Sequence, residues 1–374
     1  MADDSAVLRR PVFRGPRTAQ TAAGQKRRHH SGVSDYGDSL RRLIRNTGPI
    51  PVAQFMAESN AHYYATRDPL GRGGDFVTAP EVSQMFGEML GLWLADRWKK
   101  AGAPDNAIYV EFGPGRGTLA SDALRAMAAA GLDPDVHFVE GSPVLRAAQA
   151  EAVPQARFHD DLTTLPDDRP LLVIANEYFD ALPVRQLVKT EAGWRERMVG
   201  LEGERLVPVA SDRPMDAALP SERRDAEPGT IIETAPAQVA QMRELGTRLA
   251  TQGGAAMVVD YGYARPHTGS TLQALRAHEK VDPFAHPGEA DLTAHVDFLA
   301  LADTAIAAQA QVLGIATQSD LLRALGIERR AEALIAAAPA RTEEIASALD
   351  RLVSPEQMGT LFKALLLAGE GWSD

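Results

Sequence analysis

The fold of this chain is decided by one stretch, Glu111-Phe112-Gly113-Pro114-Gly115-Arg116-Gly117-Thr118. The stretch begins at the end of the short, mostly apolar run 108–112 and precedes the alanine-rich run 119–130, which Gly131 ends. The first run has the composition of a buried strand, and the second that of a helix with a C-terminal glycine. A strand, a glycine-rich turn and a helix are the opening unit of a parallel α/β sheet.

The spacing of the three glycines indicates what the turn binds. It is G-x-G-x-G, whereas dinucleotide-binding folds use G-x-G-x-x-G to hold a pyrophosphate at a helix N-terminus. An acid before the glycines, here Glu111, would repel a pyrophosphate but suits a ligand that carries an ammonium and a sulfonium group. This pattern is the S-adenosylmethionine signature of class I methyltransferases. A plain tight turn between a strand and a helix is the alternative.

Two further acids follow the next strands. Glu140 ends the strand 136–139, 23 residues after Gly117, where a carboxylate can accept hydrogen bonds from both ribose hydroxyls. Asp160 and Asp161 follow the weak strand 157–158, where class I methyltransferases contact the adenine amino group, and we choose Asp161. A surface acid is the alternative for that position. Together with the glycine turn, these acids predict an adenosyl-binding site.

Strands and helices continue to alternate after this unit. Apolar runs at 171–175 and 257–259 predict two more strands, with helical patterns between the strands. The stretch at about 184–230 breaks the alternation, because hairpin-like segments and a proline-rich, charged linker occupy it. We therefore expect an α/β fold with a β-rich insertion, followed by a mostly helical C-terminal third.

The N-terminal part differs from the rest. Residues 1–34 carry a net charge of +5 and few large apolar residues, so we expect a disordered basic tail. A basic leader can be an organelle transit peptide, but Asp3 and Asp4 count against that interpretation, and a signal-peptide core is lacking. Residues 35–105 are expected to form a helical cap, with a glycine-rich loop at 71–74 and one helix over 81–100.

The composition of the 374 residues excludes several classes of function. Acidic residues exceed basic ones, 50 against 39, which disfavours a broad nucleic-acid-binding surface but not a local basic strip. The lack of cysteine excludes disulfides, thiolate catalysis, cysteine-ligated zinc and iron–sulfur clusters. No apolar run approaches the ~18 residues of a membrane span, so we expect no stable membrane insertion.

Polar residues follow the strong strand 171–175, in the run Asn176-Glu177-Tyr178-Phe179-Asp180. Chemistry in open α/β sheets takes place at the carboxyl ends of strands, and methyl transfer depends on the alignment of the acceptor with the S–CH₃ bond. Two carboxylates and a carboxamide suit a cationic acceptor such as a guanidinium, which pairs bidentately with carboxylates. Alternatively, Glu177 or Asp180 caps the following turn or pairs with Arg185.

The residues at 291–297 are a further candidate group. The candidate metal ligands Asp291, Thr293, His295 and Asp297 lie close together in the sequence, but no second histidine motif is nearby, so we expect no metal site. We predict that His295 lies in the substrate cleft, and hydrogen bonding within the fold is the alternative. Asp260 follows the strand 257–259 and either lines the cleft or accepts hydrogen bonds from loop amides.

From about Gly48 to its C-terminal end, the chain resembles the MidA family of S-adenosylmethionine-dependent methyltransferases. The family includes the mitochondrial complex I assembly factor that dimethylates an arginine of a complex I subunit. The motifs that carry the resemblance are Gly48-Pro49-Ile50, the run 73–81 (GGDFVTAPE), Phe86-Gly87-Glu88, the run 111–117 (EFGPGRG), the run 176–183 (NEYFDALP), Asp260-Tyr261-Gly262, the run 288–297 (GEADLTAHVD) and the run 358–362 (MGTLF).

The resemblance implies a Rossmann-like class I methyltransferase sheet with an added helical or mixed subdomain. We expect the methyltransferase core to span residues 106–374, with the β-rich insertion and a helical insertion at about 291–350 within it. The resemblance also implies S-adenosylmethionine as the cofactor and an arginine of a protein, on a complex I subunit, as the acceptor. The predicted cofactor-binding residues are Thr78, Pro80, Glu81, Glu111, Gly113, Gly115, Gly117, Glu140 and Asp161. The predicted catalytic residues are Glu177, Asp180, Asn176 and His295.

Two other functions are weighed against this one. A catalytically silent protein could bind S-adenosylmethionine and assist assembly of a respiratory complex, but the intact acids and glycines favour an enzyme. An NAD-dependent enzyme is disfavoured by the glycine spacing. We expect a location in the cytoplasm for a bacterial protein and in the mitochondrial matrix for a eukaryotic one. The oligomeric state stays open, a homodimer included.

Overall fold

The computed structural model describes residues 36–66, 78–219 and 225–373. The chain divides into two units, Met1–Ser34 and Asp35–Asp374, and all described residues belong to the second. The expected basic tail and the glycine-rich loop 71–74 lie outside the described residues.

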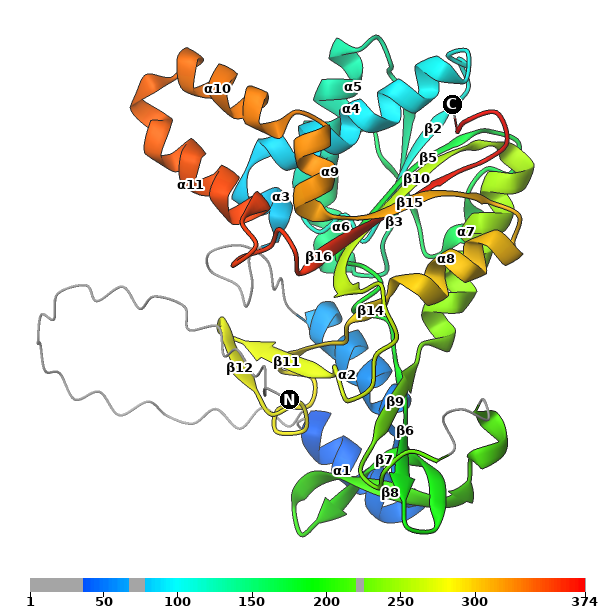
Figure 1. Ribbon diagram of the computed structural model, residues 1–374. Helices are drawn as coiled ribbons and strands as arrows, with labels where there is room; N and C mark the ends of the chain where they lie inside the picture. The colour runs from blue at the N-terminus through cyan, green and yellow to red at the C-terminus, as the bar shows by residue number, and fades with distance from the viewer. Residues whose placement is uncertain (1–35, 67–77, 220–224, 374) are drawn as a thin grey trace, which may run out of the picture. The chain divides into compact units, whose positions relative to one another are not determined.

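The main feature of the second unit is an eight-stranded sheet in the order β15-β16-β10-β5-β2-β3-β4, with β14 also paired to β10 (Figure 1). The strands from β10 to β4 are parallel, and β16 runs antiparallel between β10 and β15. The bounds are β2 Ile108–Phe112, β3 Asp135–Val139, β4 Arg157–His159, β5 Leu171–Asn176, β10 Gly254–Tyr263, β14 Val296–Asp297, β15 Gln311–Thr317 and β16 Phe362–Ala368. The predicted α/β class with a mostly parallel sheet is confirmed.

Helices cover both faces of this sheet, which is why its central strands β2 and β5 are buried along their whole length. On one face, α4 (Gln84–Lys100) and α5 (Thr118–Ala129) pack against Tyr109 and Ile174. On the other, α7 (Pro236–Gln252) and α8 (Phe298–Ala307) pack against Val110 (Figure 1). The helix α6 (Pro143–Ala152) connects β3 to β4.

The helix predicted over 81–100 is in fact two helices, α3 (Ala79–Val82) and α4. Ser83 between them has extended backbone, with φ −163° and ψ 140°. Its hydroxyl accepts a hydrogen bond from the N–H of Met85 at 3.2 Å, so it caps α4. The helical spacing of apolar residues continues across Ser83, so periodicity alone does not indicate the break between the two helices.

A second, five-stranded sheet forms at the predicted insertion. It contains β1 Ile50–Pro51, β6 Arg185–Thr190, β7 Gly193–Glu202, β8 Arg205–Pro214 and β9 Ile231–Thr234. The helices α1 (Tyr36–Thr47) and α2 (Val52–Thr66) share a core with this sheet through Phe55 and Val199. The expected cap at 35–105 thus divides, because α1, β1 and α2 join the insertion whereas α3 and α4 join the main sheet.

The C-terminal part mixes strands and helices. Residues 291–317, which the sequence assigns to a helical insertion, contribute β14, α8, β15 and the strand β13. A small sheet contains β11 Gln273–Arg276, β12 Glu279–Val281 and β13 Asp291–Thr293. The helices that follow are α9 Gln318–Ala324, α10 Ile327–Ala337 and α11 Thr342–Val353, and the short 3₁₀ helices are Leu162–Thr164, Asp216–Ala218 and Pro339–Arg341. None of the described helices has the length and hydrophobicity needed to cross a bilayer.

Candidate functional site

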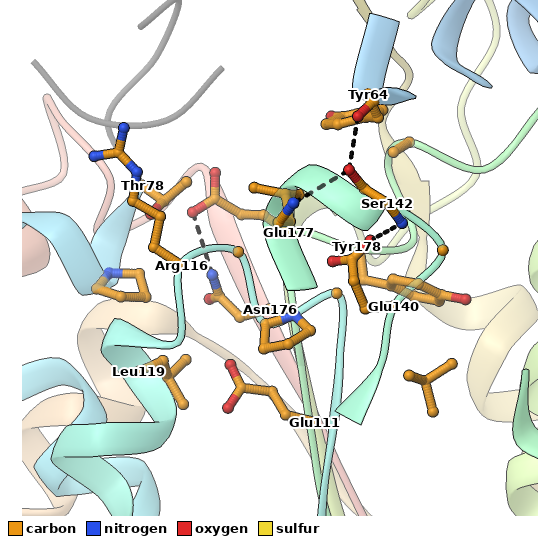
Figure 2. A pocket seen from close by; sticks show the side chains of 18 of the residues that line it. Tyr64, Thr78, Glu111, Arg116, Leu119, Glu140, Ser142, Asn176, Glu177 and Tyr178 are labelled. Atoms are coloured by element: carbon orange, nitrogen blue, oxygen red, sulfur yellow. Dashed lines mark hydrogen bonds between the residues drawn. The ribbon is translucent and has the colours of Figure 1, made fainter. Parts of the chain in front are cut away.

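A cavity of about 440 Å³ lies at the carboxyl ends of β2, β3 and β5. It is walled by the loops that follow these strands, by the start of α3 and by one face of α2. Figure 2 shows Glu111, Glu140 and Glu177 around this space, each from the end of a different strand. The cavity therefore has the position that ligand sites occupy in open α/β sheets.

The glycine turn forms one wall of the cavity. Gly113, Gly115 and Gly117 all have positive φ angles, +57°, +57° and +80°. A Cβ on Gly113 would lie 3.0 Å from the Tyr178 ring, so the close approach of these two segments requires glycine. Gly117 is not in the cavity wall, since it caps α5 and faces Ala152. The first two glycines line the cavity, and the third serves the packing of the helix.

Glu111 lies at the bottom of the cavity wall and is only 2% exposed. The hydroxyl of Tyr109 donates a hydrogen bond to its carboxylate at 2.5 Å. Burial raises the pKa of Glu111 to about 8. A cationic ligand in the cavity would favour the charged form of this side chain.

Glu140 is held with both carboxylate oxygens occupied. Its Oε1 accepts the N–H of Ser142 at 2.7 Å, and its Oε2 accepts the side-chain amide of Gln149 at 3.0 Å. The same amide of Gln149 donates to the carbonyl of Gly115 at 2.7 Å, so it links Glu140 to the glycine turn. Burial raises the pKa of Glu140. The sequence carries no signal for Gln149, because this residue comes into place only when α6 packs beneath the turn.

Of the two adjacent acids after β4, the structure places Asp160 in the cavity wall, and not Asp161, the predicted adenine contact. Asp160 lines the cavity, and its carboxylate pairs with Arg146 at 2.6 Å. Asp161 is not in the cavity wall, because its side chain accepts the N–H of Thr163 at 2.8 Å and caps a 3₁₀ helix. Local capping by an aspartate explains why the structure turns Asp161 away.

The start of α3 faces the glycine turn across the cavity. Thr78, Pro80 and Glu81 all line the space, as the family resemblance implies. The Thr118 hydroxyl donates to Glu81 at 2.9 Å, which joins α3 to the start of α5. The structure thus brings these residues together with Glu111, Gly113, Gly115 and Glu140.

Asn176 and Glu177 stand at the end of β5, and both line the cavity. The Asn176 amide donates to Glu177 Oε1 at 3.3 Å, and the N–H of Ala79 donates to the same oxygen at 3.2 Å. Burial raises the pKa of Glu177 to about 7. The buried Oδ1 of Asn176 has no hydrogen-bond partner among the described residues, so it can accept one from a ligand.

Asp180 lies behind Glu177 and does not line the cavity. Its side chain is 4% exposed, and burial together with the nearby Glu177 raises its pKa. Arg185, the alternative partner for these acids, pairs with Glu196 at 2.8 Å instead.

His295 lies outside the cavity wall, in contrast to the prediction that it lies in the cleft. Its ring packs against the Tyr261 ring, with the centroids 5.4 Å apart. Burial lowers its pKa to about 4, and its backbone N–H donates to Thr271 at 2.9 Å. The surroundings of His295 thus match the alternative interpretation, in which this residue makes contacts within the fold.

The helix α2 supplies a wall that the sequence did not single out. Asn60 donates to the carbonyls of Leu292 at 2.7 Å and Ala181 at 3.2 Å, and it accepts the N–H of Leu292 at 3.0 Å. The Tyr64 hydroxyl donates to Asp291 at 2.7 Å. These long-range bonds join segments more than 100 residues apart, so local patterns carry no signal for them.

The part of the chain that the structure describes contains no group of three or more acidic or histidine side chains arranged to hold a metal ion. The cavity does fit S-adenosylmethionine. Its acids suit the positive charges of the ammonium and sulfonium groups, and the unpartnered oxygen of Asn176 provides a further acceptor. Glu140 stands at the strand end where such folds bind ribose hydroxyls.

Comparison with known proteins gives consistent results. The family described as "Putative S-adenosyl-L-methionine-dependent methyltransferase" matches residues 89–316. The fruit-fly protein "Protein arginine methyltransferase NDUFAF7 homolog, mitochondrial" (Drosophila melanogaster) is 36% identical, over 90% of this chain and 85% of its own length. The human "Protein arginine methyltransferase NDUFAF7, mitochondrial" is 36% identical, over 88% and 82%.

A solved structure is similar over nearly the whole fold. It is the crystal structure of a COG1565 superfamily member and likely methyl transferase from Burkholderia thailandensis, bound to S-adenosyl-homocysteine. The two chains are 32% identical, with a TM-score of 0.81, over 90% of this chain and 92% of the other.

Proposed function

Because this chain belongs to the MidA family of S-adenosylmethionine-dependent methyltransferases, we propose that it methylates an arginine side chain of a protein. The names of its relatives support arginine as the acceptor. The acid Glu177, in the same cavity as the glycine turn, is the observation that carries the proposal at the level of chemistry.

When bound, S-adenosylmethionine supplies a methyl group on a positively charged sulfur. Glu140 is the residue to hold the ribose hydroxyls, since Ser142 and Gln149 fix the orientation of its carboxylate. Glu111 lies under the turn and offsets positive charge. Thr78, Pro80 and Glu81 line the cavity on the side of α3.

Glu177 is the residue to orient the acceptor. A guanidinium is a poor nucleophile because its lone pairs are delocalised, so a carboxylate that binds two of its N–H groups also concentrates electron density on the third nitrogen. Asn176 offers a neutral acceptor beside it, through Oδ1. Asp180 is buried near Glu177, and we propose that these two acids together take up the proton released after transfer.

The acceptor that the family resemblance implies is a subunit of respiratory complex I. The relatives named above are mitochondrial, so we propose the matrix as the location of a eukaryotic form and the cytoplasm as that of a bacterial one. The excess of acidic over basic residues favours a basic surface on the protein acceptor, and this attraction weakens with salt.

The test is methyl labelling. Lysate of a strain that lacks this protein is incubated with the purified enzyme and tritiated-methyl S-adenosylmethionine, and the labelled band is identified and analysed for methylarginine. We expect one labelled protein, methylated on arginine. Label on another residue type would contradict the proposal.

The matched variant for this test is Glu177→Gln, which keeps the size of the side chain but not its charge. We expect affinity for S-adenosylmethionine by calorimetry to stay within about threefold and transfer to fall by about 100-fold, because the guanidinium loses its carboxylate. Unchanged transfer would remove the orienting role. A wild-type protein that binds the cofactor and labels nothing would support the silent assembly chaperone instead.

A further inference from the structure

Asp260 lies in β10, beside the loop that carries Glu177, and it is completely buried. Its Oδ2 accepts hydrogen bonds from the backbone N–H groups of Phe179 at 3.0 Å and Asp180 at 3.1 Å. Its Oδ1 accepts the N–H of Tyr261 at 3.0 Å. One side chain thus holds two consecutive amides of the loop after β5 and one of its own strand.

The loop needs such support because Glu177 has an unfavourable backbone conformation. Its φ is +50°, in the left-handed region that costs a residue with a Cβ about 1–2 kcal/mol. Conformations of this kind persist at functional sites when the surrounding structure holds them. The N–H of Glu177 donates to the carbonyl of Val259 at 2.9 Å, so Val259 and Asp260 hold the two ends of the turn from the neighbouring strand.

Packing and charge do not explain an acid at this position. Burial raises the pKa of Asp260, and the acids Asp180 and Glu177 nearby raise it further. A neutral residue in β10 would avoid both costs. The three backbone N–H groups are the feature that favours a carboxylate here, and two of them belong to the loop of Glu177.

We propose that Asp260 is a positioning residue: it sets the backbone of residues 177–180 so that the Glu177 carboxylate points into the cavity. This inference rests on the proposed function of Glu177. It assigns to Asp260 no contact with the cofactor or the acceptor, since Asp260 is not part of the cavity wall.

The test compares Asp260→Ala, which loses all three bonds, with Asp260→Asn, which can keep the two bonds to the loop through its remaining oxygen. Transfer of tritiated methyl groups to the deletion-strain lysate is measured over a range of S-adenosylmethionine concentrations. We expect the maximal rate to fall about 100-fold in Asp260→Ala and about tenfold in Asp260→Asn. The KM for S-adenosylmethionine and its calorimetric affinity should stay within about threefold, because Glu111 and Glu140 are untouched.

The control is Asp297→Ala. Asp297 also accepts two backbone N–H groups, those of Leu299 and Ala300, but it does so at the start of α8, outside the cavity wall. We expect this variant to lose stability and to keep the wild-type maximal rate.

Three results would overturn the inference. They are a folded Asp260→Ala with a maximal rate within about twofold of wild type, a loss of cofactor affinity that parallels the loss of rate, and an equal loss of rate in the Asp297 control. If Asp260→Ala does not fold, Asp260→Asn decides alone by the same criteria. A wild-type enzyme without transfer would instead mean that the proposed function fails.

Discussion

Glu111 illustrates what single side chains contribute to this site. Only 2% of its surface is exposed, and its described hydrogen-bond donor is the hydroxyl of Tyr109. A buried carboxyl with one neutral donor favours the protonated form, because ionisation in the ligand-free protein carries a desolvation penalty. A cation bound beside the carboxylate offsets that penalty. The burial of Glu111 therefore favours a positively charged ligand in the cavity.

A prediction at the residue scale concerns Gly115, whose φ is +57° and which lines the cavity. In Gly115→Val, a branched side chain occupies the space beside the glycine turn, and the left-handed conformation becomes strained. We expect calorimetry to detect no binding of S-adenosylmethionine. The control is Gly131→Val, since Gly131 has φ +88° and open space around it.

Gly131→Val should suffer the same backbone strain and still bind the cofactor. If Gly115→Val bound with wild-type affinity, the assignment of the turn to the cofactor would be wrong. If both variants failed to bind, strain rather than contact would be the cause.

The residues of the site differ in how well sequence could identify them. Glu140 and Glu177 each follow a strand, and Glu111 is the last residue but one of another, so the rule that parallel strands end at one edge brings them together. Asn60 and Gln149 lie on helices, and only tertiary packing places Asn60 at the cavity and Gln149 against Glu140 and the glycine turn. Acids in adjacent positions, such as Asp160 and Asp161, cannot be told apart by pattern, because which one caps a turn is a local hydrogen-bonding choice.

At the scale of elements, the buried Glu88 and two more exposed arginines join three helices. Glu88 of α4 is 5% exposed, and Arg330 of α10 binds both its carboxylate oxygens, at 2.7 and 2.9 Å. Arg125 of α5 also donates to it, at 3.1 Å. A fork of this geometry fixes the orientation of α10 against α4.

The corresponding prediction is that Arg330→Ala lowers the free energy of unfolding by about 1–2 kcal/mol, because Arg125 still partly neutralises the buried Glu88. Affinity for S-adenosylmethionine should not change. Urea denaturation gives the first quantity and calorimetry the second. The exposed neighbour Arg329 provides the control, and Arg329→Ala should behave as wild type. Equal stability of the two variants would show that the ion pair contributes nothing.

Elements were predictable where a local pattern decides them. The glycine turn, the buried strands and the insertion near 184–230 all have such patterns. The break at Ser83 was missed, because apolar periodicity continues through it and a capping serine is a weak signal. The pairing of β1 with β7 was beyond prediction, since it joins segments about 150 residues apart.

At the scale of the whole molecule, the buried acids predict how stability depends on pH. The pKa values of Glu111 and Glu177, about 8 and about 7, lie above the usual value of 4.5, so the unfolded chain loses these protons first. Their contribution to stability is therefore lost as pH rises towards about 8. The buried His137 and the half-buried His295, with pKa values of about 4 against 6.5, act in the opposite sense, but only below about 6.5.

Between pH 6.5 and 8 the acids act without this opposition, so we expect the Tm of the cofactor-free protein to fall by a few degrees across that range. Differential scanning calorimetry of wild type and Glu111→Gln measures the effect. The variant should show a smaller decrease, because it buries no ionisable group at this position. A wild-type Tm that rises across this interval would contradict the predicted burial of these acids.

The position of β16 has a consequence for how the enzyme is made. In the described part of the chain, β15 is joined to the sheet through β16, and β16 also pairs Lys363 with Asp260 and Phe362 with Tyr261. A ribosome that has translated the glycine turn and the cavity acids Glu111, Glu140 and Glu177 has therefore not yet supplied the strand that flanks Asp260. The nascent chain presents an open edge of β10 until residues 362–368 emerge, and a chaperone that shields such edges would protect it during that interval.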